Sequence, residues 1–75
     1  MKKITIQDEF ITLGQFLKLA DCISTGGMAK PFLAETKVFV NGESEQRRGK
    51  KLYHQDIIKV ETCGTFEVVS HKQLS

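Results

Sequence analysis

The chain has 75 residues, of which 40% are hydrophobic and 27% are charged, and its formal net charge at pH 7 is +2. A chain of this length forms one small domain, near the lower size limit for a stable hydrophobic core. No apolar run approaches the roughly 18 residues that span a bilayer, and the N-terminal segment lacks the apolar stretch of a signal peptide. We therefore expect a single cytoplasmic domain, residues 1–75, without a membrane partner.

The first predicted elements are a strand and a helix. Residues Lys3–Ile6 are rich in β-branched side chains and alternate, which predicts a strand, and the following "QDEF" predicts a turn. Thr12 is suited to cap a helix that runs to about Asp21. Gln15 and Lys18 share a polar side of this helix. Its apolar face is marked by residues at helical spacing, namely Leu13, Phe16, Leu17 and Ala20.

A second helix is expected after a short connection. Thr25 can cap it, and it runs to about Thr36 with three apolar residues turned inward: Ala29, Phe32 and Leu33. Pro31 lies beyond the first turn of a helix that starts at Thr25. A proline there removes a backbone hydrogen bond and crowds the preceding turn. We therefore expect this helix to be short or slightly distorted.

The hydrophobic period then changes to two, which predicts strands. The pair Asn41-Gly42 is the strongest short hairpin signal, because both central residues of a type I′ turn need positive φ. Further strands are expected at Asp56–Glu61, after a turn at His54-Gln55, and at Thr65–Val69, after a turn at Cys63-Gly64. The order β-α-α-β-β-β-β predicts an α+β fold, with two short helices packed on a small, mostly antiparallel sheet.

The residue pattern does not indicate an enzyme. The chain has no P-loop, no dinucleotide-binding glycine motif and no zinc-protease motif. Cys22 and Cys63 are far apart in the sequence and lack the spacing of zinc ligands, so two buried thiols in a reducing compartment are the favoured interpretation. We expect a non-catalytic protein with no cofactor and no bound metal.

One segment that could bind an anion is "STGGMAK", at the predicted start of the second helix. A helix N-terminus presents unpaired N–H groups to phosphate, and glycine lets a ligand approach the backbone closely. The residues of interest are Thr25, Gly26, Gly27 and Lys30. An ordinary helix–helix turn with a glycine C-cap explains them too, and from the residues alone it is the favoured interpretation.

A second segment is "QRRGKKL", residues 46–52. It holds four of the eleven lysines and arginines of the chain: Arg47, Arg48, Lys50 and Lys51. Gly49 permits a bend that would turn these cations toward one surface. From charge alone, nucleic-acid binding and a solvated charged loop are equal alternatives.

Taken in order, the segments "ITLGQFLKLA", "STGGMAKPFL", "VFVNGE", "RRGKKL" and "DIIKVE" resemble the RNA-binding domain named after ribosomal protein S-four, also called the alpha-L motif. The resemblance covers residues 11–61 and is greatest to the small stand-alone bacterial proteins of the YaaA-like group. It implies an RNA-binding face formed by the two helices and the basic hairpin. By position this face contains Gln15, Lys18, Thr25, Gly26, Gly27, Lys30, Arg47, Arg48, Lys50 and Lys51.

The chain departs from the family pattern at two places. Many members carry Arg-Leu-Asp where this chain has Thr12-Leu13-Gly14, and Pro31 occupies a site that is often basic in the family. These departures shift the expected RNA contacts toward the basic segment. Tyr53 is the only aromatic side chain that we expect to be exposed, so recognition of folded RNA by shape and backbone is favoured over base stacking.

The resemblance implies a monomer that binds structured ribosomal RNA or ribosomal particles, in ribosome assembly or ribosome association. An alternative is a protein–protein adaptor that uses the same fold for an acidic protein partner. A sulfur carrier is disfavoured, because such a protein needs a C-terminal Gly-Gly and the only Gly-Gly here is internal, at Gly26-Gly27.

Overall fold

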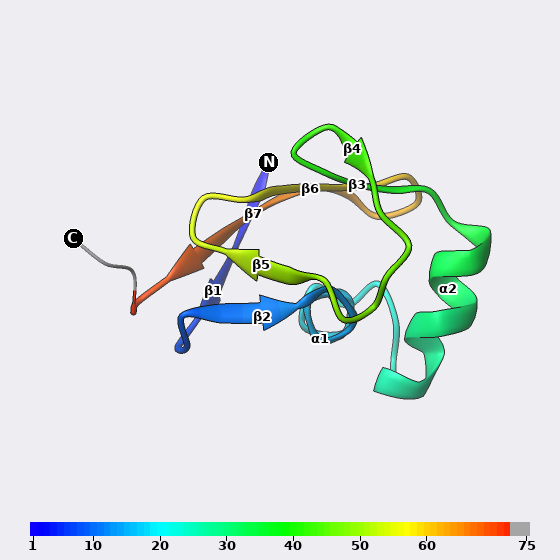
Figure 1. The fold of residues 1–75 in the computed structure, drawn as a ribbon, viewed down its shortest axis with the longest axis horizontal. Coiled ribbons are helices and arrows are strands. Elements are labelled where there is room, and N and C mark those ends of the chain that lie inside the picture. Colours follow the sequence, from blue (N-terminus) through cyan, green and yellow to red (C-terminus); the bar gives the residue numbers. More distant parts are fainter. Residues whose placement is uncertain (73–75) are drawn as a thin grey trace.

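The computed structural model describes residues 1–72. Its elements follow the sequence in an order that is close to the predicted one (Figure 1). In chain order they are β1 (Lys2–Ile6), β2 (Phe10–Thr12), α1 (Leu13–Leu19), the 3-10 helix η1 (Gly26–Met28), α2 (Ala29–Glu35), β3 (Val38–Val40), β4 (Glu43–Ser44), β5 (Lys51–Tyr53), β6 (Ile57–Val60) and β7 (Gly64–Ser70).

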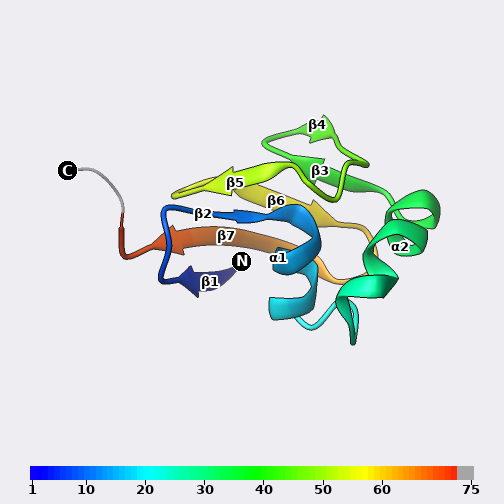
Figure 2. The same cartoon turned by 60° about the horizontal axis from the view of Figure 1, so that its bottom comes forward.

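The strands form two sheets. The larger sheet has five strands in the order β1-β7-β6-β3-β4, and its neighbouring strands are antiparallel except for the parallel pair β1 and β7. β2 and β5 form a separate antiparallel ribbon, which lies along β7 and leads directly into α1 (Figure 2). The predicted α+β class and the mostly antiparallel sheet are confirmed.

One apolar cluster joins the helices to the inner face of the larger sheet. The predicted helix faces are confirmed, because Leu13, Phe16 and Leu17 of α1 are fully buried. In α2, Ala29 and Leu33 are also buried, and the half-buried Ala20 and Phe32 pack against the same cluster. Phe16 meets Phe66 of β7 edge-to-face, with ring centroids 5.6 Å apart.

Thr12 caps α1 as predicted. Its Oγ1 accepts a hydrogen bond from Gln15 N at 3.4 Å, and Gln15 Oε1 accepts one from Thr12 N at 3.4 Å, which completes a capping box. The helix ends at Leu19, earlier than the predicted end near Asp21. Asp21 has a φ of 66°, a conformation that cannot continue a right-handed helix.

The second helix is short, as predicted, but it starts later. The segment expected to be its first turn is η1, and the side chain of Thr25 makes no capping hydrogen bond there. Because α2 begins at Ala29, Pro31 lies in its first turn. Backbone N–H groups in a first turn have no partner inside the helix, so proline removes no helical hydrogen bond here.

The hairpin prediction is confirmed, because Asn41 and Gly42 have φ values of 52° and 87°. The Asn41 side chain also ties this turn to the start of β6. Its Oδ1 accepts from Ile57 N at 2.8 Å, and its Nδ2 donates to Asp56 Oδ1 at 3.1 Å. The predicted turn at His54-Gln55 is present as well, with a φ of 72° at Gln55.

The β2–β5 ribbon was not predicted. The segment "QDEF" was expected only to turn the chain, whereas Phe10 begins β2. Lys51–Tyr53 was not expected to be a strand. Each strand has three residues and is too short to give a clear alternation by itself. Leu52, at the centre of β5, is fully buried and anchors the ribbon in the core.

Among residues 1–72, no helix has the length and apolar character that crossing a membrane requires.

The capping box predicts a measurable contribution of Thr12 to stability. We expect Thr12→Ala to lower the free energy of unfolding by about 1 kcal/mol, because a helix N-terminal N–H loses its acceptor. Thr12→Ser keeps an acceptor oxygen and serves as the matched control. Urea unfolding followed by circular dichroism measures both variants. Equal losses in the two variants would contradict a capping role.

Candidate nucleic-acid interface

The basic segment forms the loop between β4 and β5, and α1 holds its backbone in place. The N–H of Leu13 donates to the carbonyl of Lys50 at 2.8 Å, and the N–H of Gly14 donates to the carbonyl of Arg48 at 2.9 Å. These are the first two N–H groups of α1, which have no partner inside the helix. In Figure 1 the loop descends from β4 to this end of α1. The N-terminus of α1 therefore positions the basic loop.

Gly14 allows α1 to approach both the basic loop and α2. A Cβ built on Gly14 would lie 3.4 Å from the Ala29 Cβ and 3.4 Å from the Arg48 carbonyl oxygen. A methyl group would be at the near limit of an ordinary contact, and a larger side chain would have to displace the loop backbone. Gly14 therefore leaves room for the Arg48 backbone and Ala29 to lie close to α1.

One groove lies between α1, η1 and the basic loop. We call it the helix groove, and it brings together four of the predicted site residues, Gln15, Lys18, Gly26 and Arg48. The other residues that line it are Thr12, Gly14, Ala29 and Gly49. In the described part of the chain no carboxylate lines this groove, so its charge comes from Lys18 and Arg48. Such a surface suits the phosphates of a nucleic acid.

A second hollow, which we call the loop hollow, lies on the other side of the basic loop. It is lined by Val40, Asn41, Glu43, Glu45, Arg47, Lys50, Lys51, Tyr53 and Asp56. Three cationic side chains and three carboxylates therefore meet there. The structure divides the four cations of the basic segment between two hollows, whereas the sequence interpretation placed them on one surface.

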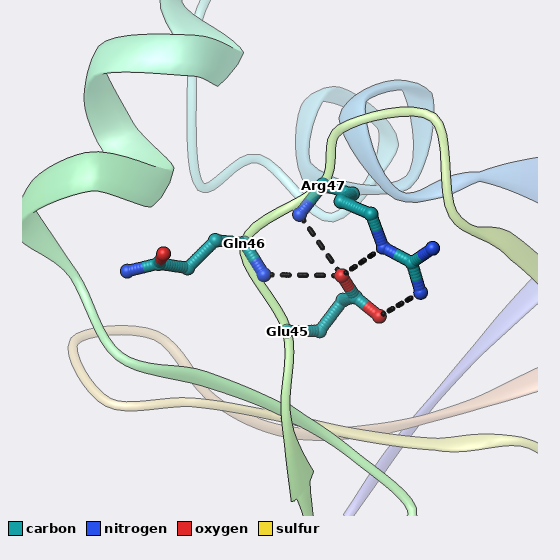
Figure 3. A network of polar contacts seen from close by, with 3 residues as sticks. All are labelled: Glu45, Gln46 and Arg47. Atoms are coloured by element: carbon teal, nitrogen blue, oxygen red, sulfur yellow. Dashed lines mark hydrogen bonds and ion pairs between the residues drawn. The ribbon is translucent and has the colours of Figure 1, made fainter.

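Arg47 is paired with Glu45 (Figure 3). Arg47 Nε lies 2.9 Å from Glu45 Oε2, and Nη2 lies 3.0 Å from Oε1. The backbone N–H groups of Gln46 and Arg47 also donate to Oε2, at 3.2 and 3.0 Å. The hydrogen bonds and charge of Arg47 lower the pKa of the Glu45 carboxyl to about 2, and Glu45 in turn raises the pKa of Arg47.

The remaining predicted residues, Thr25, Gly27 and Lys30, are exposed and adjoin Gly26 and Ala29 in the chain. The alternative of a glycine C-cap is wrong here. Neither Gly26 nor Gly27 has positive φ, and Asp21 is the positive-φ residue that follows α1. A Cβ on Gly26 would meet nothing within 4 Å. Packing within the chain therefore does not require glycine at this position. The space beside Gly26 is open to a ligand.

Two exposed aromatic side chains lie beside the loop hollow, and the sequence interpretation missed one of them. Phe10 is 37% exposed and Tyr53 is 44% exposed. Their ring centroids are 5.9 Å apart, and Lys51 Nζ lies 4.8 Å from the Phe10 centroid. The expectation that Tyr53 is the only exposed aromatic side chain is therefore wrong. No signal in the sequence shows this exposure, because a strand of three residues, Phe10–Thr12, gives no clear alternation.

The cysteines also differ from the expectation that both are buried. Cys22 is half-buried, but Cys63 is exposed, and both are free thiols. Burial and a hydrogen bond with Cys63 raise the pKa of the Cys22 thiol to about 12. Within residues 1–72, no group of three or more histidine, cysteine or acidic side chains is arranged to hold a metal.

The pairing of Glu45 with Arg47 predicts a pH-dependent stability. The pKa of Glu45 falls from an ordinary 4.5 to about 2 on folding, so between these values the unfolded chain binds more protons. The stabilisation is complete above about pH 4.5 and is lost as the pH falls through 2. We expect Glu45→Gln to lower the thermal midpoint at neutral pH, with a deficit that shrinks toward pH 2. A deficit that stays constant over this range in circular dichroism melts would contradict the pairing.

The sequence comparisons agree with this geometry. The pattern of the family described as S4 domain matches residues 4–69, from β1 into β7. The chain is 58% identical over 67 residues to the "Probable ribosome maturation protein RlbA" of Bacillus subtilis (strain 168), an alignment that covers 89% of this chain and 94% of that protein. The chain therefore belongs to the S4 domain family, the family that its sequence segments resemble.

Proposed function

We propose that this protein is a non-catalytic RNA-binding protein that binds structured ribosomal RNA during ribosome maturation. The observation that carries the proposal is the helix groove, which Lys18 and Arg48 both line and which no carboxylate of the described residues lines. Membership of the S4 domain family supports RNA as the ligand. The name of the Bacillus subtilis relative supports a role in ribosome maturation.

In this proposal the helix groove receives the phosphate backbone of an RNA helix. Arg48 and Lys18 neutralise phosphates, and Gln15 donates a further hydrogen bond. The open backbone at Gly26 lets a sugar or phosphate approach closely. Thr25, Gly27 and Lys30 extend the contact along η1 and the start of α2.

The cations of the loop hollow contribute less to duplex binding. Glu45 already neutralises Arg47, so a phosphate gains less from that residue than from Arg48. Lys50 and Lys51 share their surroundings with Glu43 and Asp56. The protein acts in this role as a single-domain monomer in the cytoplasm, with no metal or cofactor.

Arg47 is paired with Glu45, whereas Arg48 lines the helix groove, and this difference gives a direct test of RNA binding by the groove. We expect Arg48→Gln to weaken binding of a labelled RNA hairpin more than Arg47→Gln does, because Arg47 is already paired. Arg48→Gln should also reduce the slope of log affinity against log salt by about 0.7 to 0.9, the change for one lost phosphate contact. The measurement is fluorescence anisotropy over a series of salt concentrations.

The matched control is Lys59→Gln, which removes one positive charge from an exposed position on β6, away from the groove. Lys59→Gln should leave the salt slope unchanged. Equal effects of Arg48→Gln and Lys59→Gln would mean that only net charge matters, and would contradict a specific groove.

The identity of the RNA can be tested in cells. We expect ultraviolet crosslinking of the tagged protein, followed by sequencing, to concentrate reads in one region of ribosomal RNA, and Arg48→Gln to deplete that region. Scattered reads that the substitution does not change would contradict a ribosomal site. Protein partners that survive nuclease treatment, without RNA crosslinks, would favour the adaptor alternative.

A further inference from the structure

We propose that an unpaired nucleobase of the bound RNA stacks on Tyr53, with Phe10 packed beside that ring and Lys51 contacting the adjoining phosphate. This inference rests on the proposed function and specifies its ligand further, as an RNA helix flanked by at least one unpaired nucleotide. The duplex occupies the helix groove, and the unpaired nucleotide lies over the β2–β5 ribbon.

The register of the ribbon turns the aromatic rings outward. Phe10 lies opposite Tyr53, and Thr12 lies opposite Lys51. Directly opposed residues of an antiparallel pair share a face, and residues two apart along a strand share it too. The other face carries Ile11 and Leu52, and Leu52 is fully buried. The ribbon therefore has one face in the core and one face that presents two aromatic rings and a lysine.

Packing of Phe10 against Tyr53 accounts for only part of these rings. Cross-strand aromatic contact stabilises a ribbon, yet more than a third of the surface of each residue stays exposed, at 37% and 44%. An exposed π-face beside a cation is the combination that proteins use for unpaired bases, because every base has a face that can stack.

The backbone of Tyr53 is fixed before any ligand arrives. Tyr53 N donates to Asp56 Oδ2 at 2.8 Å, and Asp56 N donates to the Tyr53 carbonyl at 3.0 Å. Asp56 is itself held by Asn41, whose Nδ2 donates to Oδ1 at 3.1 Å. A tyrosine on a fixed backbone loses little conformational freedom when a base stacks on it. The entropy cost of ordering the tyrosine therefore offsets less of the stacking energy.

The charge of the loop hollow suits a single nucleotide better than a duplex backbone. Three carboxylates offset three cations there, in contrast to the helix groove. Glu45 is engaged by Arg47, and Asp56 by Asn41 and Tyr53. Lys50 and Lys51 are then the cations next to Tyr53. A base brings no charge, so a hollow with balanced charge does not repel it, and Lys51 beside the rings is the cation for the adjoining phosphate.

The outer face of the β2–β5 ribbon, with Phe10 and Tyr53, is continuous with the helix groove. β2 leads into α1 through Thr12, whose side chain contacts Gln15. Phe10, Gln15 and Lys18 line a common hollow on this side, and Gln15 and Lys18 also line the helix groove. An RNA that leaves its duplex at the groove therefore reaches the aromatic pair without crossing an intervening element.

The test uses the protein's own fluorescence. Tyr53 is the single tyrosine and the chain has no tryptophan, so intrinsic emission reports this ring alone. The probes are one RNA hairpin whose blunt stem is closed by a non-nucleotide linker, so that it contains no unpaired base, and three derivatives of it, with a 5′ extension, a 3′ extension or an internal bulge. We expect at least one derivative to bind about 5- to 150-fold more tightly than the blunt hairpin and to quench the tyrosine emission, which the blunt hairpin leaves unchanged.

Substitutions test whether the gain in affinity from an unpaired nucleotide comes from the Tyr53 ring. Tyr53→Leu should abolish the advantage of the preferred derivative and leave affinity for the blunt hairpin and the salt slope unchanged, while Tyr53→Phe should keep most of the advantage. Phe39→Leu, which removes a half-buried ring from β3 of the other sheet, is the matched control and should change neither.

The outcomes separate this inference from the proposed function. Tight, Arg48-dependent binding of the blunt hairpin with no gain and no quenching from any unpaired nucleotide would overturn the stacking site alone. An equal loss for blunt and extended RNAs in Tyr53→Leu would also overturn it, because the ring would then act through the structure of the face. Failure of the wild-type protein to bind any of the RNAs would instead contradict the proposed function.

Discussion

The structure depends on the contact between the N-terminus of α1 and the basic loop. A seven-residue helix is too short to be stable by itself. In the basic loop, repulsion between like charges disfavours a single fixed conformation. The first two N–H groups of α1 need acceptors, and the carbonyls of Lys50 and Arg48 supply them. A core that buries Leu13 and Leu52 on either side holds the two segments together. The same hydrogen bonds that complete the helix therefore place the cations.

The basic loop separates two surfaces that differ in charge. On the side of the helices, Arg48 and Lys18 line the helix groove, and no carboxylate of the described residues lines it. On the side of β5, carboxylates balance the cations, and Glu45 holds Arg47 in a bidentate pair. A uniformly basic face would attract any polyanion. In the proposed function, a face with one basic groove beside the loop hollow would distinguish the shape of an RNA as well as its charge.

Local signals in the sequence predicted much of the fold. Thr12 and its capping box, the helical spacing of Phe16 and Leu17, and the Asn41-Gly42 turn each depend on residues close together in the chain, and each is confirmed. The β2–β5 ribbon and the parallel pairing of β1 with β7 depend on partners distant in the sequence. Three-residue strands carry too little periodicity to reveal such pairing, so the sequence does not show that Phe10 is exposed.

The sequence by itself determined the family, the α+β class and the residues that carry the charge, because these follow from composition, short-range spacing and the order of the segments. Only the tertiary structure decided how the charge is divided and what surrounds it. The backbone bends at the basic loop so that Arg47 meets Glu45 while Arg48 turns to the helices. Pairing of β2 with β5 brings Phe10 to Tyr53. Both results come from packing between distant segments, and no local pattern of residues encodes them.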